Sequence, residues 1–102
     1  MKKQTVVFKK PHEEACVIET DFGFKSLQEL LGGNVKSIPL ESRLDLLFVE
    51  DGIDKKYDLN VALNGNIIVG NLIVVGTDGF VWQGLSNKES KKIIKYLNKQ
   101  TI

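Results

Sequence analysis

The stretch from Gly65 to Gly76 restricts the fold most, because it is mostly apolar and is punctuated by glycines. Two short apolar runs, 67–69 and 72–75, are separated by Gly70 and Asn71 and closed by Gly76. A segment this apolar becomes core, and its glycines mark points where the backbone turns or closely approaches another group. It contains no acid, base or nucleophile, so its primary role is structural.

Most of the remaining chain has the β-branched and aromatic composition of strands. The proline at position 39 suits an edge strand or a strand end. Strands are predicted at 5–8, 15–19, 34–40, 43–49, 59–63, 67–69, 72–75 and 80–85, with turns at 10–13, 50–52 and 77–79.

Two segments have the pattern of amphipathic helices. Ser26 and Glu29 match a capping box, and the apolar face that follows is closed by Gly32-Gly33. Ser86 and Glu89 repeat the box ahead of a second helix with the apolar stripe Ile93, Ile94 and Leu97. We therefore predict one α+β domain over 1–102: a small, mostly antiparallel sheet with one short inserted helix and a C-terminal amphipathic helix.

Composition narrows the class of protein. The chain has 102 residues and a net charge of +1, so it lacks the overall positive field that recruits duplex nucleic acid. Its N-terminal apolar run is too short for a signal peptide or a membrane span, which favours the cytoplasm. The single cysteine, Cys16, lies in a strand-like run and is interpreted as a small buried hydrophobe rather than a reactive thiol.

Catalytic and metal-binding patterns are missing from the sequence. His12 is the only histidine, so neither a Cys-His pair nor a Ser-His-Asp arrangement is indicated, and we predict no enzyme and no cofactor. The glycines match no nucleotide-binding loop. One carboxylate cluster fits a solvated turn better than a calcium loop: Glu50, Asp51, Asp54 and Asp58.

The sequence does contain aromatic, basic and amide side chains of the kinds that bind ligands. Phe80 and Trp82 share a face of an extended segment and either pack in the core or stack on a nucleobase, as Tyr57 could from its polar loop. Arg43 either pairs with a neighbouring carboxylate or contacts phosphate or guanine. The remaining candidate contacts are Lys36 for phosphate or base edges and Asn60 and Asn71 for hydrogen bonds.

Three lysines lie four residues apart on one face of the last predicted helix. They favour a solvated face that complements the carboxyl end of the helix dipole, and phosphate binding is the alternative. The three are Lys91, Lys95 and Lys99.

An ordered set of motifs resembles a small domain family of phages and mobile elements. The set spans roughly residues 24–97, and Asp58 departs from it where the family often has proline. The motifs are Leu27-Gln28-Glu29-Leu30-Leu31-Gly32-Gly33, Glu50-Asp51-Gly52, Leu59-Asn60, Ile68-Val69-Gly70-Asn71-Leu72-Ile73-Val74-Val75-Gly76 and Leu85-Ser86-Asn87-Lys88-Glu89.

Members of that family look like phage accessory proteins, and small proteins of this type are similar to anti-CBASS sponges, which sequester a bacterial immune nucleotide without cleaving it. The resemblance implies a homo-oligomeric binder of a cyclic oligonucleotide, such as a cyclic dinucleotide, acting in the host bacterial cytoplasm. A dimer or tetramer would suit a symmetric ligand. Two other classes stay open: a protein-interaction module that inhibits a host protein, and a binder of single-stranded nucleic acid.

Overall fold

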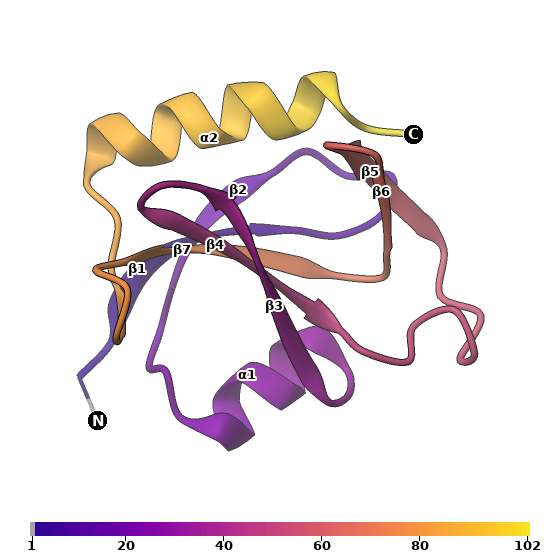
Figure 1. The fold of residues 1–102 in the computed structure, drawn as a ribbon, viewed down its shortest axis with the longest axis horizontal. Helices are drawn as coiled ribbons and strands as arrows, with labels where there is room; N and C mark the ends of the chain where they lie inside the picture. The colour runs from indigo at the N-terminus through magenta and orange to yellow at the C-terminus, as the bar shows by residue number, and fades with distance from the viewer. Residues whose placement is uncertain (1) are drawn as a thin grey trace.

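The computed structural model describes residues 2–102, which form an α+β fold with a largely antiparallel sheet and two helices, as predicted. Figure 1 shows α1 and α2 on opposite sides of the sheet. In chain order the elements are β1 (Gln4–Lys9), β2 (Cys16–Thr20), α1 (Phe24–Leu31), β3 (Val35–Glu41), β4 (Leu44–Val49), β5 (Leu59–Leu63), β6 (Asn66–Val69), β7 (Leu72–Thr77), β8 (Trp82–Gln83) and α2 (Asn87–Lys99).

The main sheet has the strand order β2-β1-β7-β4-β3, and β8 pairs with β7. All these pairs are antiparallel. Pro39 lies on β3, which is an edge strand, as its missing N–H requires. β7 lies in the centre with residues 72–75 fully buried, because helices cover both faces of the sheet. This burial explains why the sequence of β7 is continuously apolar.

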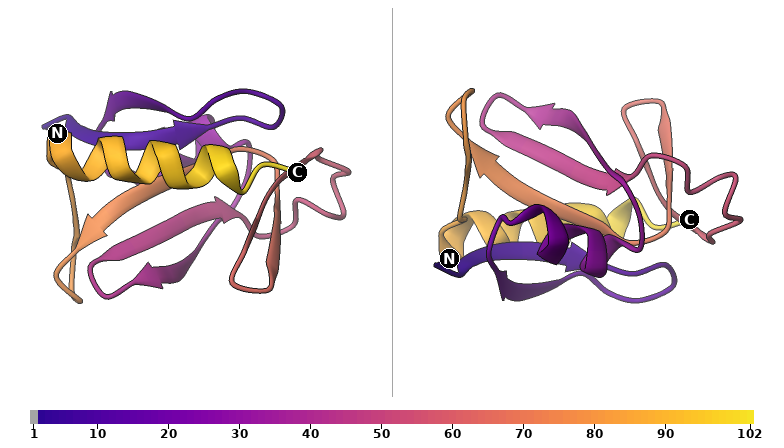
Figure 2. Two further views of the ribbon diagram at one scale, coloured as in Figure 1. Left: turned by 90° about the horizontal axis from the view of Figure 1, so that it is seen from above. Right: turned by 90° about the horizontal axis from the view of Figure 1, so that it is seen from below.

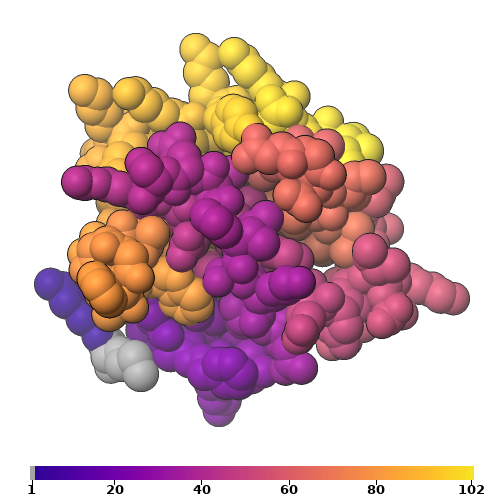
Figure 3. Space-filling model, viewed as in Figure 1, coloured from indigo at the N-terminus to yellow at the C-terminus, as the bar shows by residue number. Residues whose placement is uncertain are grey.

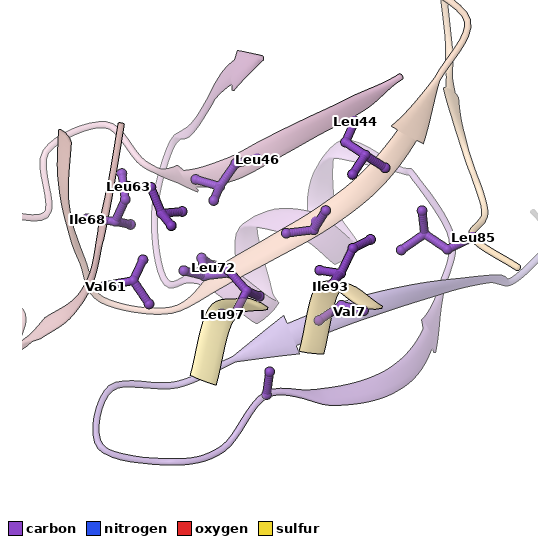
Figure 4. Close-up of a cluster of buried hydrophobic side chains, with 12 residues drawn as sticks. Val7, Leu44, Leu46, Val61, Leu63, Ile68, Leu72, Leu85, Ile93 and Leu97 are labelled. Atoms are coloured by element: carbon purple, nitrogen blue, oxygen red, sulfur yellow. The ribbon is translucent and has the colours of Figure 1, made fainter. Parts of the chain in front are cut away.

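Alternate side chains of β7 divide between two cores. On one face, Leu72 and Val74 join Ile93 and Leu97 of α2, as the close-up in Figure 4 illustrates. On the other face, Ile73 and Val75 join the leucines of α1. Figure 2 shows α2 from above and α1 from below, each lying over one of these faces.

The two predicted capping boxes have different outcomes. At α2, Ser86 Oγ accepts from the Glu89 N–H (3.1 Å) and Glu89 Oε1 accepts from the Ser86 N–H (3.0 Å), which confirms the box. At α1 the prediction is wrong, because the helix begins at Phe24 with Gly23 as its N-cap. Ser26 lies inside the first turn, where its hydroxyl donates to Asp21 Oδ2 (3.0 Å).

The C-terminus of α1 and the face of α2 follow the sequence prediction. Gly32 caps α1 in the left-handed conformation, with φ of 87°. Ile93 and Leu97 are buried and Ile94 packs against them. The lysines of α2 are exposed, including Lys91, Lys95 and Lys99.

β5 and β6 form a separate two-stranded sheet, which the sequence did not distinguish from the main one. Their hairpin turns through Asn64 (φ 49°) and Gly65 (φ 79°), the positive angles of a tight two-residue turn. Thr101 bridges to Val61, so the chain end extends this small sheet. Asn60 ties it to the main sheet, because its side-chain amide donates to the Lys9 (3.0 Å) and Gly70 (2.7 Å) carbonyls.

Two further expectations are wrong. Cys16 is exposed rather than buried, because it begins the edge strand β2 with its side chain outside the core. Phe80 belongs to a turn, since β8 contains only Trp82 and Gln83, so the two aromatic rings do not share a strand face. No helix in the described part of the chain is long and apolar enough to span a membrane.

Candidate functional site

An open depression lies where the β1–β2 turn, the end of α1 and the segment before β5 meet. Its volume is about 390 Å³, and we call it the Tyr57 depression. It is lined by polar side chains and by backbone atoms. The residues that contribute them are Lys10, Glu13, Gly32, Tyr57, Asp58 and Asn71. Two residues predicted from the sequence, Tyr57 and Asn71, are therefore brought together.

Two glycines leave the space that the Tyr57 ring occupies. A Cβ on Gly70 would lie 2.9 Å from Tyr57 Cδ2 and one on Gly32 would lie 3.0 Å from Tyr57 Oη, whereas one on Gly52 would meet Val69 Cγ2 at 2.7 Å and reach the ring only at 3.6 Å. The hydroxyl donates to the Gly32 carbonyl (2.7 Å), an acceptor left free by the end of α1. The ring is thus fixed before any ligand arrives, while part of it stays open to solvent.

Asn71 is fixed in the same way. Its Nδ2 donates to the Leu30 carbonyl (3.0 Å) in the last turn of α1. Its Oδ1 accepts no hydrogen bond from the described residues, so this oxygen is free to accept one from a ligand. The Asn71 side chain therefore makes one structural hydrogen bond through Nδ2 and keeps Oδ1 as an unused acceptor.

The depression combines both signs of charge. Lys10 supplies an ammonium group, and Glu13 and Asp58 supply carboxylates. His12 Nε2 lies 3.4 Å from Asp58 Oδ2, an exposed pair that contributes little stability. The carboxylates of this site can accept hydrogen bonds from N–H groups while its ammonium group donates hydrogen bonds to an anion.

Beside the depression lies a fully buried lysine that sequence reasoning missed. Lys9 Nζ donates to Asn60 Oδ1 (2.7 Å) and to the Lys10 carbonyl (3.3 Å). Burial holds the pKa of Lys9 below its ordinary value, and the negative charge of Glu13 partly opposes this. Asn60 is itself fully buried, so it is a structural partner of Lys9 rather than an exposed ligand contact.

The other predicted residues lie elsewhere. Trp82 packs edge-on against Phe22, with 6.4 Å between ring centroids, and donates to Asp45 Oδ2 (3.1 Å), so its ring is half-buried support for the α1 core. Phe80 is exposed on the β7–β8 turn. The seven predicted residues therefore do not converge on one pocket.

Arg43 and Lys36 provide positive charge away from the Tyr57 depression. Arg43 borders a polar depression of about 520 Å³ that also includes Asp78 and Glu89. It forms no ion pair within 4.0 Å with Glu41 or Asp45 in the described part of the chain, and Asp45 accepts from Trp82 instead. Lys36 is exposed on β3.

Lys10, Glu13 and Asp58 of the depression were missed as site residues. They come from turns without periodicity, and Asp58 was interpreted only as part of a solvated carboxylate cluster. Within residues 2–102, no three histidine, cysteine or acidic side chains gather in a way that could hold a metal ion. The described lining of the depression contains no serine, threonine or cysteine.

Comparison with known proteins identifies one family for this chain. Neither the curated proteins nor the solved structures contain a match to this chain. One family profile matches residues 1–98, and it includes the segment before Phe24 that the motif resemblance left out. Because this match spans nearly the whole chain, the protein belongs to the family described as a domain of unknown function, DUF3846.

Proposed function

We propose that this domain is a non-enzymatic nucleotide-binding protein that sequesters a cyclic oligonucleotide at the Tyr57 depression. One observation carries the proposal: a fixed aromatic ring, an ammonium group, two carboxylates and a free amide oxygen line one open depression. The resemblance to phage accessory proteins suggests that the ligand is an immune signal of the host bacterium.

Each group has a role in this proposal. A nucleobase stacks on the open part of the Tyr57 ring, because every base offers a π-face. Asp58 or Glu13 accepts hydrogen bonds from base N–H groups, and the ammonium of Lys10 contacts a phosphate oxygen. The Tyr57–Gly32 hydrogen bond reduces the ordering cost of binding, because the ring is already fixed.

The size of the depression restricts the ligand. Its 390 Å³ is near the lower end of the roughly 300–1,000 Å³ typical of ligand pockets, which is room for one nucleotide unit. A cyclic dinucleotide would then be shared by the depressions of two copies related by a two-fold axis. Because the proposal is sequestration without cleavage, it requires that bound ligand be recovered intact.

Isothermal titration calorimetry with cyclic mono-, di- and trinucleotides tests the proposal. Lys10→Gln should weaken binding roughly tenfold, because it removes a charge-assisted hydrogen bond. Lys36→Gln is the matched control, since it removes the same charge from an exposed position on β3 and should leave affinity unchanged. Asp58→Asn should change which base is preferred.

Three results would count against this function. They are the absence of binding to every cyclic nucleotide in the panel, equal losses in the Lys10→Gln and Lys36→Gln variants, and recovery of hydrolysed ligand after denaturation. The last result would indicate an enzyme.

A further inference from the structure

The Tyr57 depression presents more acceptor groups than donor groups to a ligand. Three of its side chains carry oxygen atoms that accept hydrogen bonds, and Lys10 supplies the one ammonium group of the described lining. The three are Glu13, Asp58 and Asn71. Because a carboxylate or amide oxygen that loses water without gaining a partner costs free energy, such a lining favours a ligand that brings N–H groups.

These acceptor oxygens are largely unused inside the fold. Among residues 2–102, the Glu13 carboxylate forms no side-chain hydrogen bond and no ion pair within 4.0 Å, so both of its oxygens are available. Asp58 Oδ2 lies 3.4 Å from His12 Nε2, which leaves Oδ1. The Asn71 amide is oriented by the hydrogen bond from its Nδ2 to the Leu30 carbonyl (3.0 Å), so Oδ1 is fixed as the acceptor.

The donors of the lining, by contrast, are mostly used. The Tyr57 hydroxyl proton is engaged by the Gly32 carbonyl (2.7 Å). Four backbone N–H groups of the lining also donate to carbonyls of the fold, those of Glu13, Gly32, Tyr57 and Gly70. A ligand in the depression therefore meets unused oxygens on several sides, and the ammonium group of Lys10 is its main source of hydrogen-bond donors.

Both carboxylates stand on the exterior of the molecule. Glu13 and Asp58 are exposed, and the intervening Tyr57 ring is half-buried. Figure 3 shows the pink surface of the segment before β5 projecting from the molecule beyond the purple surface of α1. A base can therefore reach the carboxylates from solvent without opening either core.

The bases differ in what they offer to such a site. Guanine carries N1–H and a 2-amino group side by side on its Watson–Crick edge, so one carboxylate can accept from both in parallel. Adenine and cytosine place a single amino group beside an acceptor ring nitrogen, and uracil places one N–H between two carbonyls. In those three bases an acceptor would face a carboxylate oxygen, and that contact is repulsive.

We propose that the Tyr57 depression selects guanine and that Glu13 recognises its Watson–Crick edge. The inference rests on the proposed nucleotide-binding function and names the base. The two Glu13 oxygens accept from N1–H and from one amino hydrogen, while the base stacks on Tyr57. Asp58 Oδ1 or Asn71 Oδ1 accepts the second amino hydrogen, and Lys10 stays available for phosphate.

Calorimetric titration with three cyclic dinucleotides tests the choice of base. The probes are cyclic di-GMP, cyclic di-IMP, whose base keeps N1–H but lacks the 2-amino group, and cyclic di-AMP. Cyclic di-GMP should bind at least about tenfold more tightly than either of the others, because a bidentate contact to a base discriminates by that much or more.

A matched pair of variants tests the role of Glu13. Glu13→Gln should lower the affinity for cyclic di-GMP about tenfold, because the new amide presents N–H groups to the N–H groups of guanine. Glu14→Gln is the control, since Glu14 is the exposed neighbour, carries the same charge and does not line the depression. In NMR spectra the N1 proton of bound guanine should be protected from exchange in the wild type and in Glu14→Gln, and lose that protection in Glu13→Gln.

The outcomes separate this inference from the function on which it rests. Equal affinities for the three probes, or tightest binding of cyclic di-AMP, would overturn guanine selection and leave nucleotide binding in place. An undiminished preference for cyclic di-GMP in Glu13→Gln would overturn the role of Glu13. Absence of binding to all three probes and to the rest of the cyclic nucleotide panel would remove the proposed function and this inference together.

Discussion

Replacing Asn60 with leucine tests the least ordinary feature of the fold, a lysine buried without a carboxylate partner. Lys9 is fully buried, and no ion pair involving it lies within 4.0 Å in the described part of the chain. Asn60 Oδ1 (2.7 Å) is the closer of its two acceptors. The ammonium group therefore depends on a neutral amide and a backbone carbonyl for its hydrogen bonds, with the Glu13 charge assisting from beyond 4.0 Å.

The expected cost follows from these contacts. Asn60→Leu keeps the branching and the number of side-chain heavy atoms but removes the acceptor of Lys9 Nζ and the donor to the Lys9 and Gly70 carbonyls. Stranding a buried charge costs about 3–5 kcal/mol, so the free energy of unfolding should fall by about that amount. Adding Lys9→Met should recover about 2 kcal/mol, since only the two carbonyls then lack partners.

Urea denaturation of the wild type, both single variants and the double variant at neutral pH provides the measurement. A double-mutant cycle isolates the Lys9–Asn60 coupling from the loss of the carbonyl contacts. A loss below about 1 kcal/mol in Asn60→Leu, or no recovery in the double variant, would refute the reasoning, because the ammonium would then have another source of stabilisation.

The pH dependence gives an independent readout of Lys9. Its folded-state pKa is lowered, so as pH rises the native state loses this proton before the unfolded state does. The unfolded state then binds more protons, and the free energy of unfolding rises with pH from the lowered pKa up to the ordinary value near 10.5. The Lys9→Met variant should lack this rise in the free energy of unfolding at alkaline pH. The exposed lysines are the same in both proteins, so they do not account for the difference.

Three further predictions concern local structure. Gly70→Ala should destabilise the fold more than Gly65→Ala in thermal denaturation: both glycines have positive φ (about 1–2 kcal/mol of strain), but only at position 70 would the new Cβ clash with Tyr57. Ser86→Ala should lose about 1 kcal/mol of stability and reduce helical circular dichroism, because it removes the cap of α2. As pH falls through the lowered pKa of Asp78, protonation of its carboxylate should weaken the hydrogen bond from the Phe80 N–H and loosen the β7–β8 turn. The Phe80 amide resonance should then change with pH in NMR spectra, and an amide chemical shift that does not titrate would contradict this prediction.

Much of the fold was predictable because local patterns and tertiary structure agree. The continuous apolar run of β7 required cover on both faces, and both helices supply it. The Ser86 box was correct because its residues face solvent, where nothing competes with the local hydrogen bonds. The Ser26 box failed because α1 begins earlier, at Phe24, which leaves Ser26 inside the first turn with its hydroxyl donating to Asp21.

The site was less predictable because its residues meet only through tertiary structure. Tyr57, Asn71 and Lys10 come from three segments without a shared period, and their proximity depends on the Asn60 link between the two sheets. The i, i+2 spacing in an expected strand predicted Trp82 and Phe80 on one face, but the turn at Asp78 directs one ring inward and the other to solvent.

The glycines around Tyr57 explain why a candidate binding surface can be hidden in ordinary turn signals. Gly32, Gly52 and Gly70 each mark the end of an element in sequence, and close approach to another group was predicted only for the glycines of the 65–76 stretch. In the folded chain a Cβ on any of them would lie within 3.6 Å of the same ring. Two of them also have positive φ, so turn geometry accounts for Gly32 and Gly70 but not for Gly52. At Gly52 the constraint is Val69, because Val69 Cγ2 would lie 2.7 Å from a new Cβ while Tyr57 would be at an ordinary contact distance of 3.6 Å. Gly32 and Gly70 therefore protect the position of the Tyr57 ring, and Gly52 protects the packing of Val69.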